Sequence, residues 1–383
     1  MVHFSVTSPL PPAVRLTLLA PELIWPEPGD QRTLGKLATP AFEWLAARAT
    51  FVRQPPQAFE NVLAGLFGLG DAPFGALRRL GEAADTLPDD GHWLCADPVH
   101  LRFHHERIVL ADAGAFELDD DEAAALIAAL NATFADVGQF HAATARRWYL
   151  RLNTAPQGHF LRGAVDEKFA PISTIAGRRL DGEITEQNGP LTRWLNEVQM
   201  FLHGHPVNER RQAAGQPTVN SLWLWGGGPL PELARPDFSV VCTDNPLAAG
   251  LAAASDLTVR GTAGGLDALL AAADRQARPL VVLDSLLAPV LYEDGEAWRA
   301  AWQQLEADWF APLRSALGRR VDAVDLVAPT IYGRLGWSLH GGDRWKFWRR
   351  PRPIAALASQ LADESAGQVT GKAASQAAEG AHS

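Results

Sequence analysis

The chain has 383 residues, of which 47% are hydrophobic and 20% charged, and a formal net charge of -10. This length is enough to bury a large core, and the acidic balance argues against a general nucleic-acid binder. The two cysteines, Cys95 and Cys242, lie far apart, which excludes a disulfide framework and a cysteine-based zinc site and indicates a reducing compartment.

The apolar run nearest the N-terminus, Leu16 to Trp25, is interrupted by Pro21 and Glu22 and lacks a basic flank. It is therefore neither a signal peptide nor a membrane span. We expect a cytoplasmic protein with no membrane partner and no nucleic-acid partner.

The first elements are a buried strand and two helices. Val14 to Leu19 reads as a strand closed by Pro21. A helix is predicted from Thr39, with Pro40 at its first position, and a second from Ala58 to Leu66.

The pattern changes near Thr86. Short strand-like pieces (WLCADPVHLRF, RIVLAD and RWYLRL) surround a helix that opens with Asp119 to Asp121, where carboxylates favour the helix N-terminus. A helix from Pro190 to about Leu202 closes this block, which reads as an α+β lobe.

From Asn220 on, apolar strands alternate with helices, which indicates a parallel sheet covered on both faces. The predicted strands are SLWLW, FSVVCT, LTVRG, PLVVLD and AVDLVAP. The predicted fold class is therefore α/β, with a parallel-sheet core (residues 1–86 and 216–355), an inserted α+β lobe (87–215) and a polar, disordered tail (356–383).

The least generic stretch is HGHPVNERRQAAGQPTVNSLWLWGGGP, His203 to Pro229. Its triple glycine, Gly226 to Gly228, lacks the Lys-Ser/Thr of a phosphate loop, so a tight exit from a strand is the favoured reading over a phosphate cradle. Asn208 would cap a short helix that stops at Gly215.

Two other segments can be interpreted either as functional sites or as ordinary structural elements. His100, His104 and His105, near Asp97 and Glu106, could hold a metal, although solvated hairpin residues are commoner. The run RWKFWRRPRP, Arg344 to Pro353, could dock onto an acidic partner or a nucleic-acid strand, although a basic edge with its tryptophans packed inward is favoured.

One stretch resembles a known family. The residues HPVN, Arg211, Gly215, Asn220 and WLWGGG are similar in order and spacing to a hallmark of the archaeal-type, cofactor-independent phosphoglycerate mutases. Thr39-Pro40 and Phe67-Gly68 are weaker similarities. The resemblance implies an alkaline-phosphatase-like α/β core with an inserted lobe, and the layout looks closest to a bacterial offshoot, the RpfE-type regulatory proteins.

Departures from the family pattern fall on its chemistry. The resemblance places the family's nucleophile pair on Phe59-Glu60 and its first metal-binding Asp-Gly on Ala20-Pro21. The metal-binding histidine expected after PLVVLD is also missing. A phenylalanine cannot carry a phosphoryl group, and two-metal phosphoryl transfer needs clustered carboxylates and imidazoles.

Two hypotheses follow. The first is a non-catalytic regulatory or binding protein without a cofactor, whose partner is a small phosphorylated or carboxylate metabolite or a protein. It would bind through His205, Asn208, Arg211 and Asn220, unless these residues only join the two lobes. The alternative is an active phosphoglycerate mutase or phosphohydrolase with Mn or Mg in a site rebuilt from Asp97, His100, His205 or Asp284.

Overall fold

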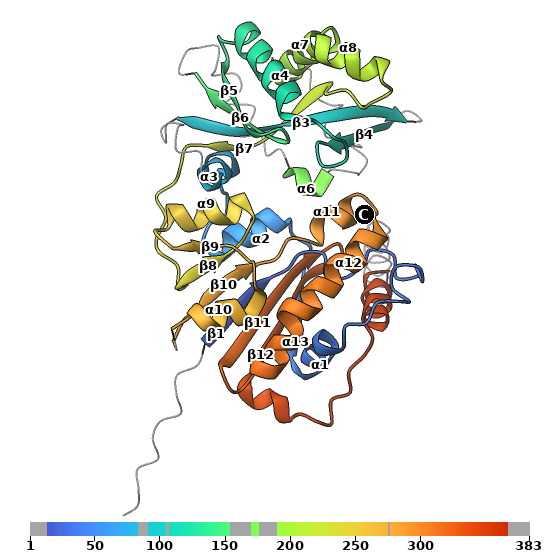
Figure 1. Ribbon diagram of the computed structural model, residues 1–383, viewed down its shortest axis with the longest axis vertical. Helices are drawn as coiled ribbons and strands as arrows, with labels where there is room; N and C mark the ends of the chain where they lie inside the picture. Colours follow the sequence, from blue (N-terminus) through green and yellow to red (C-terminus); the bar gives the residue numbers. More distant parts are fainter. Residues whose placement is uncertain are drawn as a thin grey trace, which may run out of the picture.

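The computed structural model describes residues 14–82, 91–104, 107–153, 170–175, 190–274 and 276–366. The sequence-based expectations for His105, Glu106 and the tail beyond residue 366 lie outside these ranges. The described residues form two sheets stacked along the long axis of the molecule, with helices between and around them (Figure 1).

The larger sheet has seven strands. Their order is β2 (Thr50–Gln54), β12 (Gly333–His340), β11 (Val321–Thr330), β1 (Val14–Leu19), β10 (Pro279–Val282), β8 (Val240–Cys242) and β9 (Val259–Arg260). The strands from β11 to β9 run parallel, whereas β12 and β2 add an antiparallel edge.

Helices cover both faces of this sheet because its central strands are apolar on both sides. One face packs against α1 (Pro40–Arg48), α10 (Gly265–Ala272), α12 (Gly295–Leu305), the π-helical turn η1 (Glu306–Phe310) and α13 (Ala311–Ala316). The other packs against α2 (Phe59–Leu66) and α9 (Pro246–Ala254). The short helix α11 (Leu287–Leu291) follows β10.

The smaller sheet is antiparallel and has five strands. Its path is β4 (Arg107–Asp112), β3 (His92–His104), β6 (Arg147–Leu152) and β5 (Gly138–Thr144), and β7 (Ser221–Gly228) pairs with the other edge of β3. Its outer face is covered by α4 (Asp120–Thr133), α7 (Pro190–His203) and α8 (Pro206–Ala213) (Figure 1).

The prediction that Ser221 to Trp225 belongs to the parallel core, within residues 216–355, is wrong. This strand lies beside β3 in the smaller sheet. Trp223 and Trp225 point toward the large core, whereas Leu222 and Leu224 point toward α7. A strand buried on both faces has the same continuous apolar run in either kind of sheet, so the pattern alone could not assign it.

The expected disordered tail is also wrong in its first part, because residues 354–366 form a helix. Ile354, Ala358 and Leu361 recur at helical spacing and are buried in the core. Asp363 and Glu364 on the same helix are exposed.

A helix that was not predicted, α3 (Phe74–Gly81), lies between the two sheets (Figure 1). It crosses α9 closely, because Gly81 faces the backbone of Pro246 and Gly250, and Gly250 in turn faces the carbonyl of Leu77. A Cβ atom at either glycine would overlap these backbone atoms. The inserted lobe and the core are thus held in direct contact through α3.

No helix among the described residues combines the length and apolarity needed to cross a membrane.

Candidate functional site

A cavity of about 300 Å³ lies between the two sheets, at the carboxyl ends of the parallel strands. The core contributes Glu60 on α2, Asn245 before α9 and Asp284 after β10. The lobe contributes Arg78, Asp97, Asp112, Arg146 and Arg147. In open α/β sheets, ligands bind in crevices at this end of the strands. This cavity, here called the interlobe cleft, is the candidate functional site.

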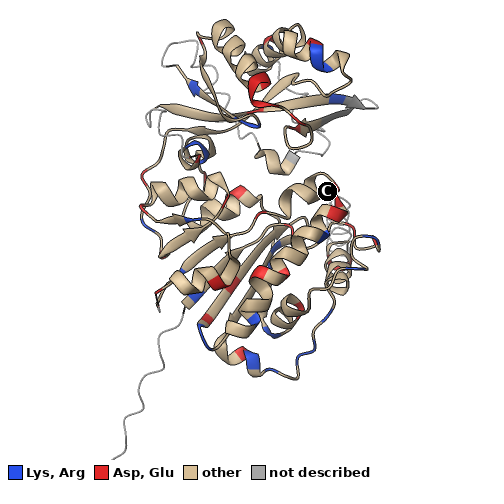
Figure 2. Cartoon of the chain, viewed as in Figure 1, with Lys and Arg blue, Asp and Glu red and all other residues tan. Residues whose placement is uncertain are grey.

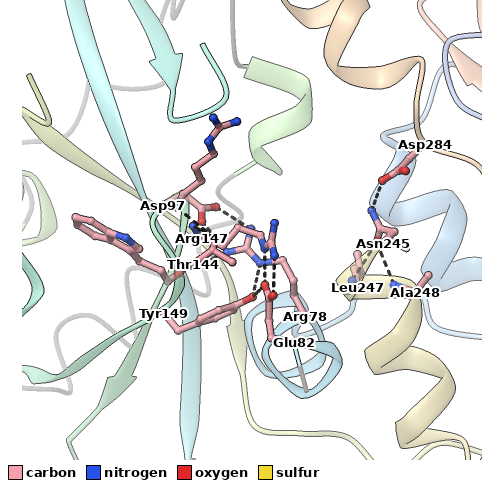
Figure 3. Close-up of polar contacts among 12 residues, drawn as sticks. Arg78, Glu82, Asp97, Thr144, Arg147, Tyr149, Asn245, Leu247, Ala248 and Asp284 are labelled. Carbon is pink, nitrogen blue, oxygen red and sulfur yellow. Dashed lines mark hydrogen bonds and ion pairs between the residues drawn. The ribbon is translucent and has the colours of Figure 1, made fainter. Parts of the chain in front are cut away.

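One side of the interlobe cleft is a buried ion-pair network (Figure 3). Arg78 Nη2 and Nη1 donate to the two Asp97 oxygens at 2.7 and 2.9 Å, and both residues are buried. Trp225 Nε1 also donates to Asp97, at 2.8 Å. Although burial lowers the pKa of Arg78, the attraction of Asp97 outweighs it and raises this pKa. Asp97 is therefore fully engaged within the protein.

The network continues to the cleft surface through Tyr149 and Glu82. Arg78 Nε donates to the Tyr149 hydroxyl at 2.9 Å, and this hydroxyl donates to Glu82 at 2.7 Å. Arg147 donates to both oxygens of the Glu82 carboxylate, with Nε at 2.6 Å and Nη2 at 2.8 Å. Arg147 is held in one orientation although more than a third of its side chain is exposed.

The core side of the cleft carries carboxyl groups whose partners are neutral. Asn245 caps α9 with its carbonyl oxygen and donates its amide to Asp284 at 2.7 Å (Figure 3). Ser173, on the short helix α6 (Ile172–Ile175), donates to the buried Glu60 at 2.6 Å. Burial raises the pKa of both Glu60 and Asp284, and these hydrogen bonds oppose the shift.

A third carboxyl group lies on the lobe side. Tyr292 donates a short hydrogen bond to Asp112, and burial raises the pKa of Asp112. Arg146 is exposed at the cleft and makes no ion pair with any residue in the described ranges. Arg146 and Arg147 thus both place guanidinium groups at the lining of the cleft.

Phe59 is the first residue of α2 and lies at the floor of the cleft. It is buried, and it also lines a second cavity of about 170 Å³ near Glu22 and Thr330. The residue that the family resemblance aligns with a nucleophile therefore sits at the ligand cavity but has no atom that can attack phosphorus.

Within the described ranges, no three Asp, Glu, His or Cys side chains come together closely enough to hold a metal ion. Asp97 is occupied by Arg78 and Trp225, and Asp284 by Asn245. In this arrangement Asp97 and Asp284 are held by other partners, and a Mn or Mg site stays a prediction.

The four residues predicted to bind a ligand lie in the lobe, and none of them lines the interlobe cleft. Asn208 is on α8, which lies on the outer face of the smaller sheet, and His205 is the N-cap residue just before this helix (Figure 1). The stretch that holds them continues into β7, whose Trp225 lines the cleft.

Each of the four uses its polar atoms within the protein. Asn208 donates to the carbonyls of Leu202 and Val219 at 2.7 and 2.8 Å and accepts from the Val219 amide at 2.9 Å. Arg211 donates to the Pro217 and Glu117 carbonyls and pairs with Glu122. These contacts favour the architectural alternative, and a binding role for either residue stays a prediction.

Asn220 and His205 behave similarly. Asn220 accepts from the Leu101 amide at 2.7 Å and donates to the Leu101 carbonyl at 2.9 Å. His205 caps α8 by accepting from the Val207 amide, and burial lowers its pKa. The expectation that Asn208 caps this helix is wrong. Pro206 occupies the first helical position, so the helix begins two residues before Asn208 and His205 is its N-cap.

The structure bears on two further expectations, for the triple glycine and for His100. Gly226 and Gly228 have positive φ angles and pack against Phe74 and Pro73 of the α3 segment, in agreement with a tight strand exit. His100 Nδ1 lies 2.8 Å from the Thr218 carbonyl oxygen, to which it donates, and the side chains of His104 and His105 lie outside the described residues, so the metal-site expectation stays a prediction.

Sequence reasoning missed Arg78, Glu82, Arg147 and Tyr149. They lie on an unpredicted helix and in a strand that was read only as structure. One sequence signal could have found them. Before residue 153 the chain has two Arg-Arg pairs, in RRLGE and RRWYL, and these two pentapeptides contain all four residues.

No protein-family model matches the chain. Its sequence is similar to proteins named 2,3-bisphosphoglycerate-independent phosphoglycerate mutase. It is 28% identical over 214 residues to the one from Methanosarcina mazei, covering 53% of this chain and 52% of that protein. It is 28% identical over 218 residues to the one from Methanosarcina acetivorans, covering 54% and 52%. The chain thus spans about half the length of these relatives.

Among solved structures, the PH0037 protein from Pyrococcus horikoshii superposes with a TM-score of 0.52 at 15% identity, over 90% of this chain and 92% of that chain. At this identity the likeness shows the fold alone. The predicted resemblance to phosphoglycerate mutases and the α/β fold class are confirmed. The relation to RpfE-type proteins stays a prediction.

Proposed function

We propose that this phosphoglycerate-mutase-like chain is a non-catalytic protein that binds a small phosphorylated or carboxylate metabolite in the interlobe cleft. The observation that carries the proposal is Phe59, buried at the first turn of α2 on the cleft floor, where the resemblance aligns a nucleophile. A benzyl side chain offers no route to a phosphoryl-enzyme intermediate.

The ligand class follows from the groups that remain available in the cleft. Arg147 is oriented by Glu82, and Arg146 is exposed beside it. Guanidinium groups bind phosphate and carboxylate oxygens in a bidentate manner. Asn245, Ser173 and Tyr292 offer neutral polar groups for hydroxyls on the same ligand.

The residues His205, Asn208, Arg211 and Asn220 are proposed to be architectural. Their hydrogen bonds to main-chain groups tie α8, β3 and the entry to β7 together. A direct role in ligand binding would require these contacts to break first.

The second candidate is a metal-dependent mutase or phosphohydrolase with a rebuilt site. It is favoured by one observation, that Glu60, Asp97 and Asp284 all line the same cavity. It requires at least one of these carboxylates to leave its present partner and bind Mn or Mg.

The test combines turnover and binding on the same purified protein. Conversion of 3-phosphoglycerate to 2-phosphoglycerate is measured with added manganese, with and without chelator. Binding of 3-phosphoglycerate is measured by calorimetry for wild type, Arg146→Ala and the matched control Arg193→Ala, an exposed arginine on α7 outside the cleft.

We expect no turnover, and binding that weakens in Arg146→Ala but not in Arg193→Ala. Turnover that disappears with chelator would establish the second candidate. If the folded protein shows no turnover and binds neither phosphoglycerate nor inorganic phosphate, the proposal that the cleft binds a phosphorylated metabolite is wrong.

A further inference from the structure

The described surface has one concentrated aromatic and cationic segment, residues 345–352, here called the aromatic–basic loop. Trp345, Phe347 and Trp348 are 66%, 81% and 65% exposed. The expectation that the tryptophans pack inward is therefore wrong. Large aromatic side chains that remain in water next to one another usually mark a contact surface.

The residues on both sides of the loop are held to the rest of the molecule. Before it, Arg344 donates to the carbonyl of Gly318 at 2.7 Å in the turn η2 (Gly341–Trp345). After it, Ile354 is buried and begins the helix over residues 354–366. Pro351 and Pro353 prevent this helix from extending backward through the loop.

The charge of the loop is opposite to that of the whole chain. Arg349, Arg350 and Arg352 are exposed, whereas the chain carries a net charge of -10. Within the part of the chain that the structure describes, none of the three forms an ion pair with a carboxylate. In Figure 2 this basic segment runs along the end of the molecule farthest from the smaller sheet.

We propose that the aromatic–basic loop docks the protein on an anionic phospholipid surface. Tryptophan and phenylalanine favour the boundary between headgroups and acyl chains, and arginines bind the phosphate groups above it. Such peripheral contact needs no membrane-crossing helix. None of the residues that line the interlobe cleft belongs to the aromatic–basic loop.

The geometry favours a lipid surface over a nucleic-acid strand. Phe347 and Trp348 pack edge to face, with ring centroids 5.3 Å apart and an interplanar angle of 81°. They form one compact apolar projection and do not offer separate stacking faces along a groove, which single-stranded nucleic acids use.

The experiment is vesicle co-sedimentation of the full chain with phosphatidylcholine vesicles and with vesicles that also contain phosphatidylglycerol. The variants are Arg349→Glu/Arg350→Glu, Phe347→Ser/Trp348→Ser, and the matched control Arg193→Glu/Met200→Ser. The control removes an exposed cation and a 74% exposed hydrophobic side chain from α7. Circular dichroism checks that all variants fold.

We expect binding only to vesicles with phosphatidylglycerol, weakened by salt and reduced by at least about tenfold in the charge-reversal variant. The serine variant should lose binding as well, whereas the control should bind like wild type. Equal binding to both vesicle types, or an unaffected charge-reversal variant, would overturn the proposal. The proposal would also be overturned, in favour of nucleic acid, if a fluorescent single-stranded oligonucleotide binds more tightly than the vesicles do and the same variants abolish that binding.

Discussion

Arg78 and Asp97 form a bidentate ion pair that is buried between the helix α3 and the central strand of the smaller sheet. The pair lies where the two lobes meet, and it orients both Tyr149 and Trp225. Removing Arg78 would leave the Asp97 carboxylate buried without a cation, which should lower the stability of the fold.

Replacing Arg78 with methionine should lower the free energy of unfolding by about 3–5 kcal/mol, because Asp97 would remain buried without its cation. Arg78→Met/Asp97→Leu should cost less than the sum of the two single replacements. Urea denaturation measures both values. Arg235→Met, which removes a 4.0 Å pair with exposed Asp256, is the control and should stay within about 0.5 kcal/mol. Additive single effects would show that the pair is not coupled.

The buried carboxyl of Glu60 should make stability depend on pH. Since burial raises its pKa above the ordinary value of 4.5, the folded state holds the proton more tightly than the unfolded state. This contribution is fully present below about pH 4.5 and is lost as pH rises through the folded-state pKa.

Glu60→Gln cannot ionise and keeps an oxygen for Ser173. Its stability relative to wild type should therefore increase as pH rises from 4.5 toward 8, measured by urea midpoints. Glu232→Gln, at an exposed position, is the control. Parallel wild-type and Glu60→Gln curves would contradict the expectation.

Asn208→Ala should reduce stability by about 1–3 kcal/mol, because it leaves the Val219 amide and two carbonyls unsatisfied in a buried region. Phosphoglycerate binding by the folded fraction should not change. Gln212→Ala, on the exposed side of the same helix, should change neither quantity. A selective loss of binding without a loss of stability would restore the sequence-based assignment of Asn208 to the ligand site.

Gly250→Ala should destabilise the protein by about 1–3 kcal/mol, since the new methyl group would overlap the Leu77 carbonyl at the α3–α9 crossing. Gly65→Ala in α2 has open space around it and should stabilise by about 0.5–1 kcal/mol. Thermal unfolding of the two variants compares these signs directly. A neutral Gly250→Ala would mean that the helices can move apart without cost.

The sequence predicted much of the framework. The strand at Val14, the helix at Pro40 and the helix Pro246–Ala254 were recoverable because proline and apolar periodicity define them locally. The partner of β7 was not recoverable, because pairing with β3 depends on contacts 120 residues or more away in the chain, such as Ser221 with Val99.

The candidate site was predicted only in part. Phe59, Asp97 and Asp284 were singled out, and all three line the interlobe cleft. Arg147 and Glu82 were not, because their meeting depends on how α3 packs against the smaller sheet. The conspicuous polar residues of the HPVN stretch instead form hydrogen bonds with main-chain groups, since buried main-chain groups need hydrogen-bond partners as much as ligands do.

The position of α3 bears on how the protein unfolds. Trp93 and Trp225 of the smaller sheet share one apolar cluster with Leu251 and Leu280 of the larger sheet. If the smaller sheet were removed, the side of α9 that carries Leu251 would be exposed to water. The separated smaller sheet would in turn expose Trp93 and Trp225. Although the chain has two sheets, it should therefore melt in a single cooperative transition, and neither half should be obtainable as an autonomous folding unit.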